Sequence, residues 1–292
     1  MPLPNFLLVG AGKSATRSLY NYMIQHPDIF MPKVKEPQFF VANEVKGRIQ
    51  KWVEDYDQYV KLFDGSNGKK AIGEASVMYL FFYKEAIQQI KKYLGTDVKI
   101  MMILRNPVER AYSAYNFVHI NNPEEKYSFE EALAMEEERY INHSTLFMQY
   151  KSMGLYEAAV KSYLESFPNV HIMWYDEFRS NPEKVLKGVF EYLGVDANVK
   201  IDYTRQWNKG GKKWKNPVLR WLFMSDNIFK KGYKLFNPKR KGVRTNEFFT
   251  KNFMETTTPM KPETRERLIE FFRDDIDKLS VITGRNLSEW LK

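Results

Sequence analysis

The first apolar run of the chain leads directly into a glycine-rich loop and then into a helical pattern. The run FLLV spans residues 6–9 and the loop GAGKSATR spans residues 10–17. A loop that joins a buried strand to a helix presents free backbone N–H groups and the positive end of the helix dipole. The stretch therefore predicts an anion site, in which Gly10 and Gly12 let the backbone approach the ligand and Lys13 supplies a charge.

Short apolar runs alternate with longer helical patterns along the rest of the chain. We expect strands at Phe6–Val9, Ala71–Glu74, Lys99–Leu104 and Val170–Trp174. Their apolar runs are continuous, which is typical of strands covered by helices on both faces. Helices are expected at Ser14–Gln25, Tyr83–Tyr93, Pro107–Val118, Leu155–Phe167, Pro182–Tyr192 and Pro262–Leu279. The pattern predicts an α/β, three-layer, P-loop NTPase-like fold with a central parallel sheet flanked by helices.

The length and composition limit the kind of protein. All 292 residues are expected to form a single domain, in which residues 203–260 serve as a lid or acceptor-facing segment. The absence of cysteine excludes disulfides and thiolate metal sites, and four scattered histidines lead us to expect no metal. No run approaches the roughly 20 apolar residues of a membrane span, and the N-terminus lacks the basic region of a signal peptide. A cytoplasmic chain is expected.

The net charge of +9 is concentrated in residues 205–244, which we call the basic segment. It holds 13 Lys and Arg against one acid, so it carries +12 while the remainder carries −3. Its interleaved aromatic residues suit a polyanion, a phosphate or an anionic membrane surface. A solvated basic surface is the alternative interpretation.

The opening loop differs from the phosphate loop of kinases and ATPases. A Walker A loop that ended in Gly12, Lys13 and Ser14 would need a glycine at position 7, which is Leu7. The loop alone is therefore a moderate signal for a phosphate ligand, because a Gly-Lys-Ser turn also serves as an ordinary helix cap.

The strand KIMMIL, residues 99–104, distinguishes between classes of phosphate ligand. In a kinase or ATPase it should end in an acid that organises magnesium, but here Arg105 follows. Ser113 lies eight residues further on, in a helix opened by Pro107. We expect Arg105 and Ser113 to reach a second phosphate.

These residues resemble the sulfotransferases that use 3′-phosphoadenosine 5′-phosphosulfate. The similar stretches, in the family's order, are VGAGKSATRSLYNYM, KEPQFF, GEASVMYL, ILRNPVERAYSAY, GLYEAAVKSYLESFP and WYDEFRSNPEKVLKGVFEYLGV. The resemblance covers residues 5 to 196, about two-thirds of the chain, and is closest to bacterial and glycosaminoglycan-type members. Cytosolic phenol and steroid enzymes usually carry a catalytic histidine after the second strand, where this chain has Glu74.

The resemblance implies a donor site. The loop residues Gly12, Lys13, Ser14, Ala15, Thr16 and Arg17 would hold the 5′-phosphosulfate. Arg105 and Ser113 would hold the 3′-phosphate, which distinguishes this nucleotide from ATP. A further basic loop over the 3′-phosphate would come from NKGGKKW or PKRKGVR, and both remain open.

The resemblance also implies an in-line displacement with three catalytic residues. Lys13 is expected to stabilise the leaving oxygen, Glu74 to accept the proton of the acceptor hydroxyl, and Lys35 to lie near that hydroxyl. Glu74 could instead be a salt-bridge partner at a strand end, and His119 is the second candidate base. Tyr156 is expected in the core or lining the acceptor site. The helical spacing of Leu155, Ala159, Tyr163 and Leu164 favours the core.

Two other classes of function stay open. One is a P-loop kinase or NTPase, although this chain lacks the first glycine of the Walker A loop and the magnesium-binding acid that such enzymes need. The other is a non-catalytic polyanion- or nucleotide-binding protein that uses the basic segment. For the sulfotransferase, a glycan, a lipid or a natural product is an acceptable hydroxyl acceptor, and no specific nucleic acid is expected.

Overall fold

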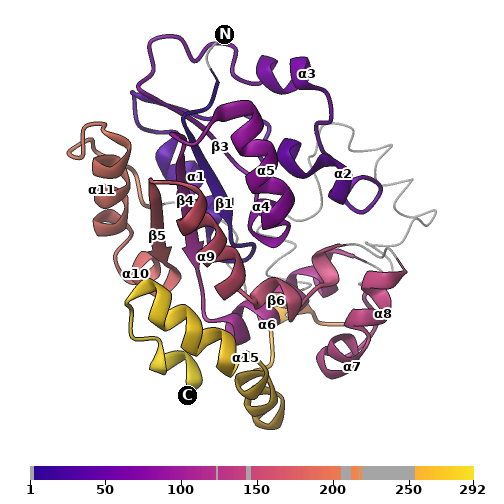
Figure 1. Cartoon of the computed structure of the whole chain (residues 1–292). Coiled ribbons are helices and arrows are strands. Elements are labelled where there is room, and N and C mark those ends of the chain that lie inside the picture. The colour runs from indigo at the N-terminus through magenta and orange to yellow at the C-terminus, as the bar shows by residue number, and fades with distance from the viewer. Residues whose placement is uncertain (1–2, 123, 143–145, 205–211, 217, 219–253) are drawn as a thin grey trace.

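The computed structural model describes residues 3–122, 124–142, 146–204, 212–216, 218 and 254–292. A central sheet of five parallel strands has the order β2-β3-β1-β4-β5 (Figure 1). The strands are β1 (Phe6–Gly10), β2 (Ile29–Phe30), β3 (Ala71–Ala75), β4 (Lys99–Leu104) and β5 (Val170–Trp174). The four strands expected from the sequence are confirmed. The short β2 is additional, because two residues leave no pattern to detect.

Helices cover both faces of this sheet (Figure 1). They are α1 (Thr16–Met23), α2 (Ala42–Val45), α3 (Tyr56–Lys61), α4 (Met78–Phe81), α5 (Tyr83–Leu94), α6 (Pro107–Asn121), α7 (Phe129–Ala134), α8 (Glu136–Ile141), α9 (Glu157–Ser166), α10 (Tyr175–Ser180), α11 (Pro182–Leu193) and α15 (Pro262–Thr283). Short 3-10 turns lie at η1 (Phe39–Val41), η2 (Leu146–Met148), η3 (Ser152–Gly154) and η5 (Ser288–Leu291). The α/β architecture predicted from the sequence is confirmed.

The continuous apolar runs of the strands feed two separate cores. Leu7 and Val9 of β1 enter one core with α4, α5, α6, α9 and α15. Phe6 and Leu8 enter the other with α1, α10 and α11. Alternate residues of a strand point to opposite faces, so a strand buried on both sides needs no polar residues.

Several helix boundaries differ from the sequence prediction by one to four residues, and two of them have a clear cause in the backbone. Helix α1 begins at Thr16 and not at Ser14, because Ala15 has a left-handed φ of 66° that a helix interior excludes. Helix α15 continues beyond Leu279 to Thr283, where Gly284 (φ 64°) ends it.

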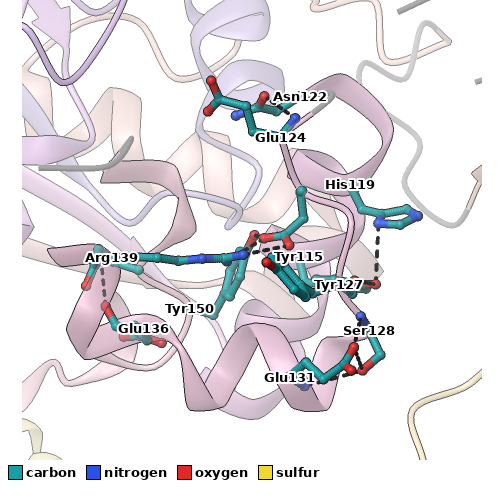
Figure 2. A network of polar contacts seen from close by, with 12 residues as sticks. Tyr115, His119, Asn122, Glu124, Tyr127, Ser128, Glu131, Glu136, Arg139 and Tyr150 are labelled. Atoms are coloured by element: carbon teal, nitrogen blue, oxygen red, sulfur yellow. Dashed lines mark hydrogen bonds and ion pairs between the residues drawn. The ribbon is translucent and has the colours of Figure 1, made fainter. Parts of the chain in front are cut away.

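A buried charged network links helix α8 to the segment before α7 and to the turn that precedes η3. The carboxylate of Glu125 accepts hydrogen bonds from Arg139 (Nη1 2.7 Å, Nη2 3.0 Å) and from the hydroxyl of Tyr150 (2.5 Å), and Figure 2 shows Arg139 and Tyr150 meeting there. The carboxylate of Glu136 accepts from the backbone N–H groups of Lys151 and Ser152, each at 2.7 Å. Because a carboxylate paired in this way is fully satisfied, the region can bury charge without orphaned groups.

Most of the lid expected at residues 203–260 lies outside the described residues, as does most of the basic segment. Two short strands near the ends of this region are described. They are β6 (Lys212–Trp214) and β7 (Met254–Thr256), which pair antiparallel. The indole Nε1 of Trp214 donates to the carbonyl of Ile120 at 3.3 Å, which fastens β6 to the end of α6.

Candidate functional site

The loop between β1 and α1 has the backbone shape of an anion site. Lys13 (φ 71°) and Ala15 (φ 66°) both adopt the left-handed conformation, which is costly for non-glycine residues and is often retained for function. No side chain in the described part of the chain caps α1, so its first N–H groups and its dipole face the loop. Ser14 and Thr16 are buried, whereas Arg17 is exposed.

The two glycines of the loop differ in their roles. A Cβ at Gly10 would lie 2.7 Å from Cβ of Leu80, so packing against α4 requires glycine there. A Cβ at Gly12 would meet Val77 at an ordinary 3.7 Å, so the protein itself tolerates a side chain at this position. The open space beside Gly12 leaves its backbone accessible to a ligand.

Arg105 lies directly beside this loop, as the sequence predicts. It follows β4, which pairs in parallel with β1, and its Nη1 donates to the carbonyl oxygen of Lys13 at 3.2 Å. The guanidinium carbon lies 4.5 Å from the ring centroid of Tyr175, and Nη2 lies 4.0 Å from a carboxylate oxygen of Glu109. These contacts hold a side chain that is only 17% exposed. The structure thus brings Arg105 and the loop together.

Ser113 lies within helix α6, and the side chain of Lys13 contacts the same helix. Asn106 caps this helix by accepting from the N–H of Val108 at 2.9 Å, and half-buried Ser113 lies within the helix. One turn after Ser113, the ring of Phe117 receives the Lys13 ammonium group at 3.9 Å from its centroid. Residues four apart share a helix face, so Ser113 and Phe117 face the loop side together. No local pattern in the sequence pointed to Phe117.

Glu74 occupies the predicted place on β3, beside β1, but it is fully buried. Its Oε2 accepts from Ser76 Oγ at 2.8 Å and its Oε1 accepts from the Tyr79 hydroxyl at 2.6 Å. Burial raises the pKa of Glu74 to about 7, while the two hydrogen bonds and the charge of Lys35 oppose the rise. Burial therefore favours the protonated carboxyl group at a pH where an exposed glutamate is ionised.

A second carboxylate that sequence reasoning missed lies next to Lys35. Lys35 Nζ contacts Glu36 Oε1 at 2.6 Å, with side-chain exposures of 10% and 28%. Glu36 has a left-handed φ of 64°, and its N–H donates to the carbonyl of Ala75 at 3.0 Å. The loop that carries both residues therefore docks on the carboxyl end of β3, near Glu74. The available signal was a glutamate beside the predicted Lys35 and before a proline.

His119, the second candidate base, lies near the far end of α6, in the network of Figure 2. Its Nδ1 lies 3.4 Å from the hydroxyl of Tyr115, whose O–H donates to the carbonyl of Tyr127. These contacts engage His119 with its own helix and the segment after it. Among the described residues, no group of three or more His, Asp or Glu side chains is arranged to hold a metal ion.

Comparison with known proteins decides the family. The family model described as "Sulfotransferase domain" matches residues 3–279. This chain belongs to the sulfotransferase family. The family resemblance given by the six sequence stretches is confirmed, and the match extends past them to include most of the C-terminal helix.

Two curated relatives that the chain resembles are larger proteins. The bifunctional heparan sulfate N-deacetylase/N-sulfotransferase 3 of Homo sapiens is 25% identical over 99% of this chain and 31% of its own length. The membrane-associated sulfotransferase kil1 of Dictyostelium discoideum is 32% identical over 44% of this chain and 27% of its own length. The chain thus spans less than a third of either relative. No helix in the described ranges has the length and apolar character needed to cross a membrane.

A solved structure of similar size supports the fold. The crystal structure of a sulfotransferase from Alicyclobacillus acidocaldarius superimposes with a TM-score of 0.77 and 32% identity, and the alignment covers 100% of both chains. The β1–α1 loop, Arg105 and the two glutamates thus belong to a sulfotransferase fold.

Proposed function

We propose that this protein transfers a sulfuryl group from 3′-phosphoadenosine 5′-phosphosulfate to a hydroxyl group of an acceptor. The observation that carries the proposal is the contact between Arg105 and the carbonyl of Lys13. It joins a backbone anion loop to an arginine at the position where a kinase would need a magnesium-binding acid. Two separated anionic groups on one ligand, a 5′-phosphosulfate and a 3′-phosphate, match this pair of positive sites.

Each residue of the donor site has a distinct role in this proposal. The loop Gly12, Lys13, Ser14, Ala15, Thr16 and Arg17 holds the 5′-phosphosulfate with backbone N–H groups and short side chains. Arg105 and Ser113 hold the 3′-phosphate. Lys13 leaves the ring of Phe117 and donates to the bridging oxygen, where negative charge grows as the bond from sulfur to the leaving nucleotide breaks.

The acceptor oxygen forms the new bond to sulfur, and its proton passes to a carboxylate. We propose Glu36 for this step, because geometry takes precedence over pKa and both oxygens of Glu74 already accept hydrogen bonds inside the core. The side chain of Glu36 is 28% exposed and lies against Lys35, which would orient the acceptor hydroxyl. Glu74, the base expected from the sequence, is the alternative, and its raised pKa suits a general base.

For the acceptor we propose a carbohydrate, because several relatives are named for heparan sulfate or carbohydrate sulfation. The hydroxyl as the accepting group is the expectation from the sequence. In this proposal residues 1–292 form a single domain. The basic segment, which lies largely outside the described residues, would cover the acceptor or contact an anionic polymer or membrane surface.

Transfer of labelled sulfate to a panel of glycans, amino sugars, lipids and small alcohols tests the proposal. Transfer of labelled sulfate to a glycan hydroxyl supports the proposal. Transfer only to an amino group changes the acceptor class, and no transfer to any compound of the panel contradicts the proposal. Thermal shift separates the other classes of function. Stabilisation by adenosine 3′,5′-bisphosphate without magnesium is expected, whereas stabilisation only by magnesium-ATP indicates a kinase, and only by heparin indicates a polyanion binder.

A further inference from the structure

Four buried polar atoms near the loop make no hydrogen bond of normal geometry to any residue in the described ranges. They are Oγ of Ser14, Nε of Arg105, Nε of Arg110 and the hydroxyl of Tyr156. Most buried polar groups in proteins are paired, and an unpaired one lowers stability. Several such atoms in one place are expected where a bound ligand completes their hydrogen bonds.

These groups are close neighbours even though they come from separate elements. Burial raises the pKa of Tyr156 to about 12, and the charges of Arg110 and Arg105, together with the hydroxyl of Ser14, act against the rise. Packing gives the same placement independently. A Cβ on Gly154 would lie 3.1 Å from Cβ of Pro107, so the turn before Tyr156 lies against the junction that follows Arg105.

The C-terminal helix fixes Tyr156 from the other side. The carboxylate of Asp275, on α15, accepts hydrogen bonds from the backbone N–H of Tyr156 (2.9 Å) and of Glu157 (3.0 Å). Asp275 thus caps helix α9 from a distant part of the sequence, which satisfies two N–H groups of the first turn. Phe272, one turn earlier on α15, packs against Gly154.

We propose that Tyr156 is a positioning residue of the donor site, acting through Ser14. When the nucleotide binds, the Ser14 hydroxyl donates to one of its phosphate oxygens, and the Tyr156 hydroxyl then donates to Ser14 Oγ. A donor hydrogen bond to Ser14 polarises its O–H, so the two bonds strengthen each other. Asp275 of α15 accepts a hydrogen bond from the backbone N–H of Tyr156 and so holds the tyrosine beside the loop. The inference rests on the donor site proposed above.

Calorimetry with adenosine 3′,5′-bisphosphate tests this role, and α9 offers a matched control. Tyr163 is also fully buried, and its hydroxyl donates to the carbonyl of Tyr79 at 2.9 Å, away from the loop. Y156F should weaken nucleotide binding about tenfold while the unliganded protein melts at the same or a higher temperature, because an unpaired hydroxyl is removed. Y163F should melt at a lower temperature and bind the nucleotide as the wild type does.

A double-mutant cycle tests the route through Ser14. If Tyr156 acts through this residue, adding Y156F to S14A should change affinity less than about twofold, whereas independent contributions would add. Additive losses, or wild-type affinity in Y156F, overturn the inference. Absence of nucleotide binding in the wild type would instead contradict the proposed donor site itself, so the two failures are distinguishable.

Discussion

Arg105 donates from Nη1 to the backbone carbonyl of Lys13 across 3.2 Å, so the residue that directly follows β4 holds the turn of the β1–α1 loop. The two residues belong to the proposed 3′-phosphate and 5′-phosphosulfate sites, respectively. Lys13 has a left-handed backbone, which a single carbonyl contact helps to maintain. A change at Arg105 should therefore act directly on the 3′-phosphate site and only to a smaller extent, through the loop, on the 5′-phosphosulfate site.

The substitution R105A should weaken binding of adenosine 3′,5′-bisphosphate by about 1.5–3 kcal/mol, because a charge-assisted contact to phosphate is lost. Binding of 5′-AMP, which lacks the 3′-phosphate, should change much less. Calorimetry with both nucleotides measures the difference. R273A is a suitable control, because Arg273 is an exposed arginine of α15 that pairs with Glu270. Equal losses for both nucleotides would remove Arg105 from the 3′-phosphate site.

The substitutions E36Q and E74Q separate the two candidate bases. Glutamine keeps the shape of either side chain but accepts no proton, so the variant of the true base should lose about 10²–10⁴ in turnover with donor affinity nearly unchanged. We expect this result for E36Q. A large loss confined to E74Q would restore the base expected from the sequence. Full activity of both variants would exclude both glutamates as the base and would leave His119 as the candidate.

Glu74 should make stability depend on pH. Its folded pKa is about 7 against 4.5 for the ordinary group, so its favourable effect is present below pH 4.5 and is lost as pH rises to 7. The loss is on the order of 3 kcal/mol, since each pKa unit corresponds to about 1.4 kcal/mol. E74Q should therefore gain stability relative to the wild type over this range. The difference in melting temperature between E74Q and the wild type should change between pH 5 and pH 7.5. The same difference at both pH values would contradict the raised pKa.

The buried network of Figure 2 predicts an asymmetric response to mutation. R139A leaves the carboxylate of fully buried Glu125 without its bidentate partner, which should cost about 3–5 kcal/mol of unfolding free energy. The double variant E125Q/R139M removes both charges and should recover a large part of that loss. Urea denaturation measures both. An effect of R139A below 1 kcal/mol would show that the pair contributes little.

The sequence predicted the fold well because its signals are local. The continuous runs at 6–9 and 99–104 mark strands buried on both faces, and Pro107 and Pro262 mark helix starts that the structure confirms. Arg105 was placed correctly, because the carboxyl ends of neighbouring parallel strands lie at one edge of the sheet.

What escaped prediction depends on contacts between distant residues. The exposure of Glu36 and the burial of Glu74 follow from how the loop around Lys35 docks on β3, which no local pattern encodes. Likewise, Asp275 caps a helix more than 100 residues away in sequence. A capping residue is recognisable from sequence when it directly precedes its helix, and this one does not.

The most direct test of the whole account is calorimetric titration of the wild-type protein, without magnesium, with adenosine 3′,5′-bisphosphate and with 5′-AMP. Because Arg105 and Lys13 join two anion sites, the protein should bind adenosine 3′,5′-bisphosphate at least about tenfold more tightly than 5′-AMP. Equal affinity for the two nucleotides, or binding that requires magnesium, would contradict the assignment of this loop and arginine to a sulfuryl donor.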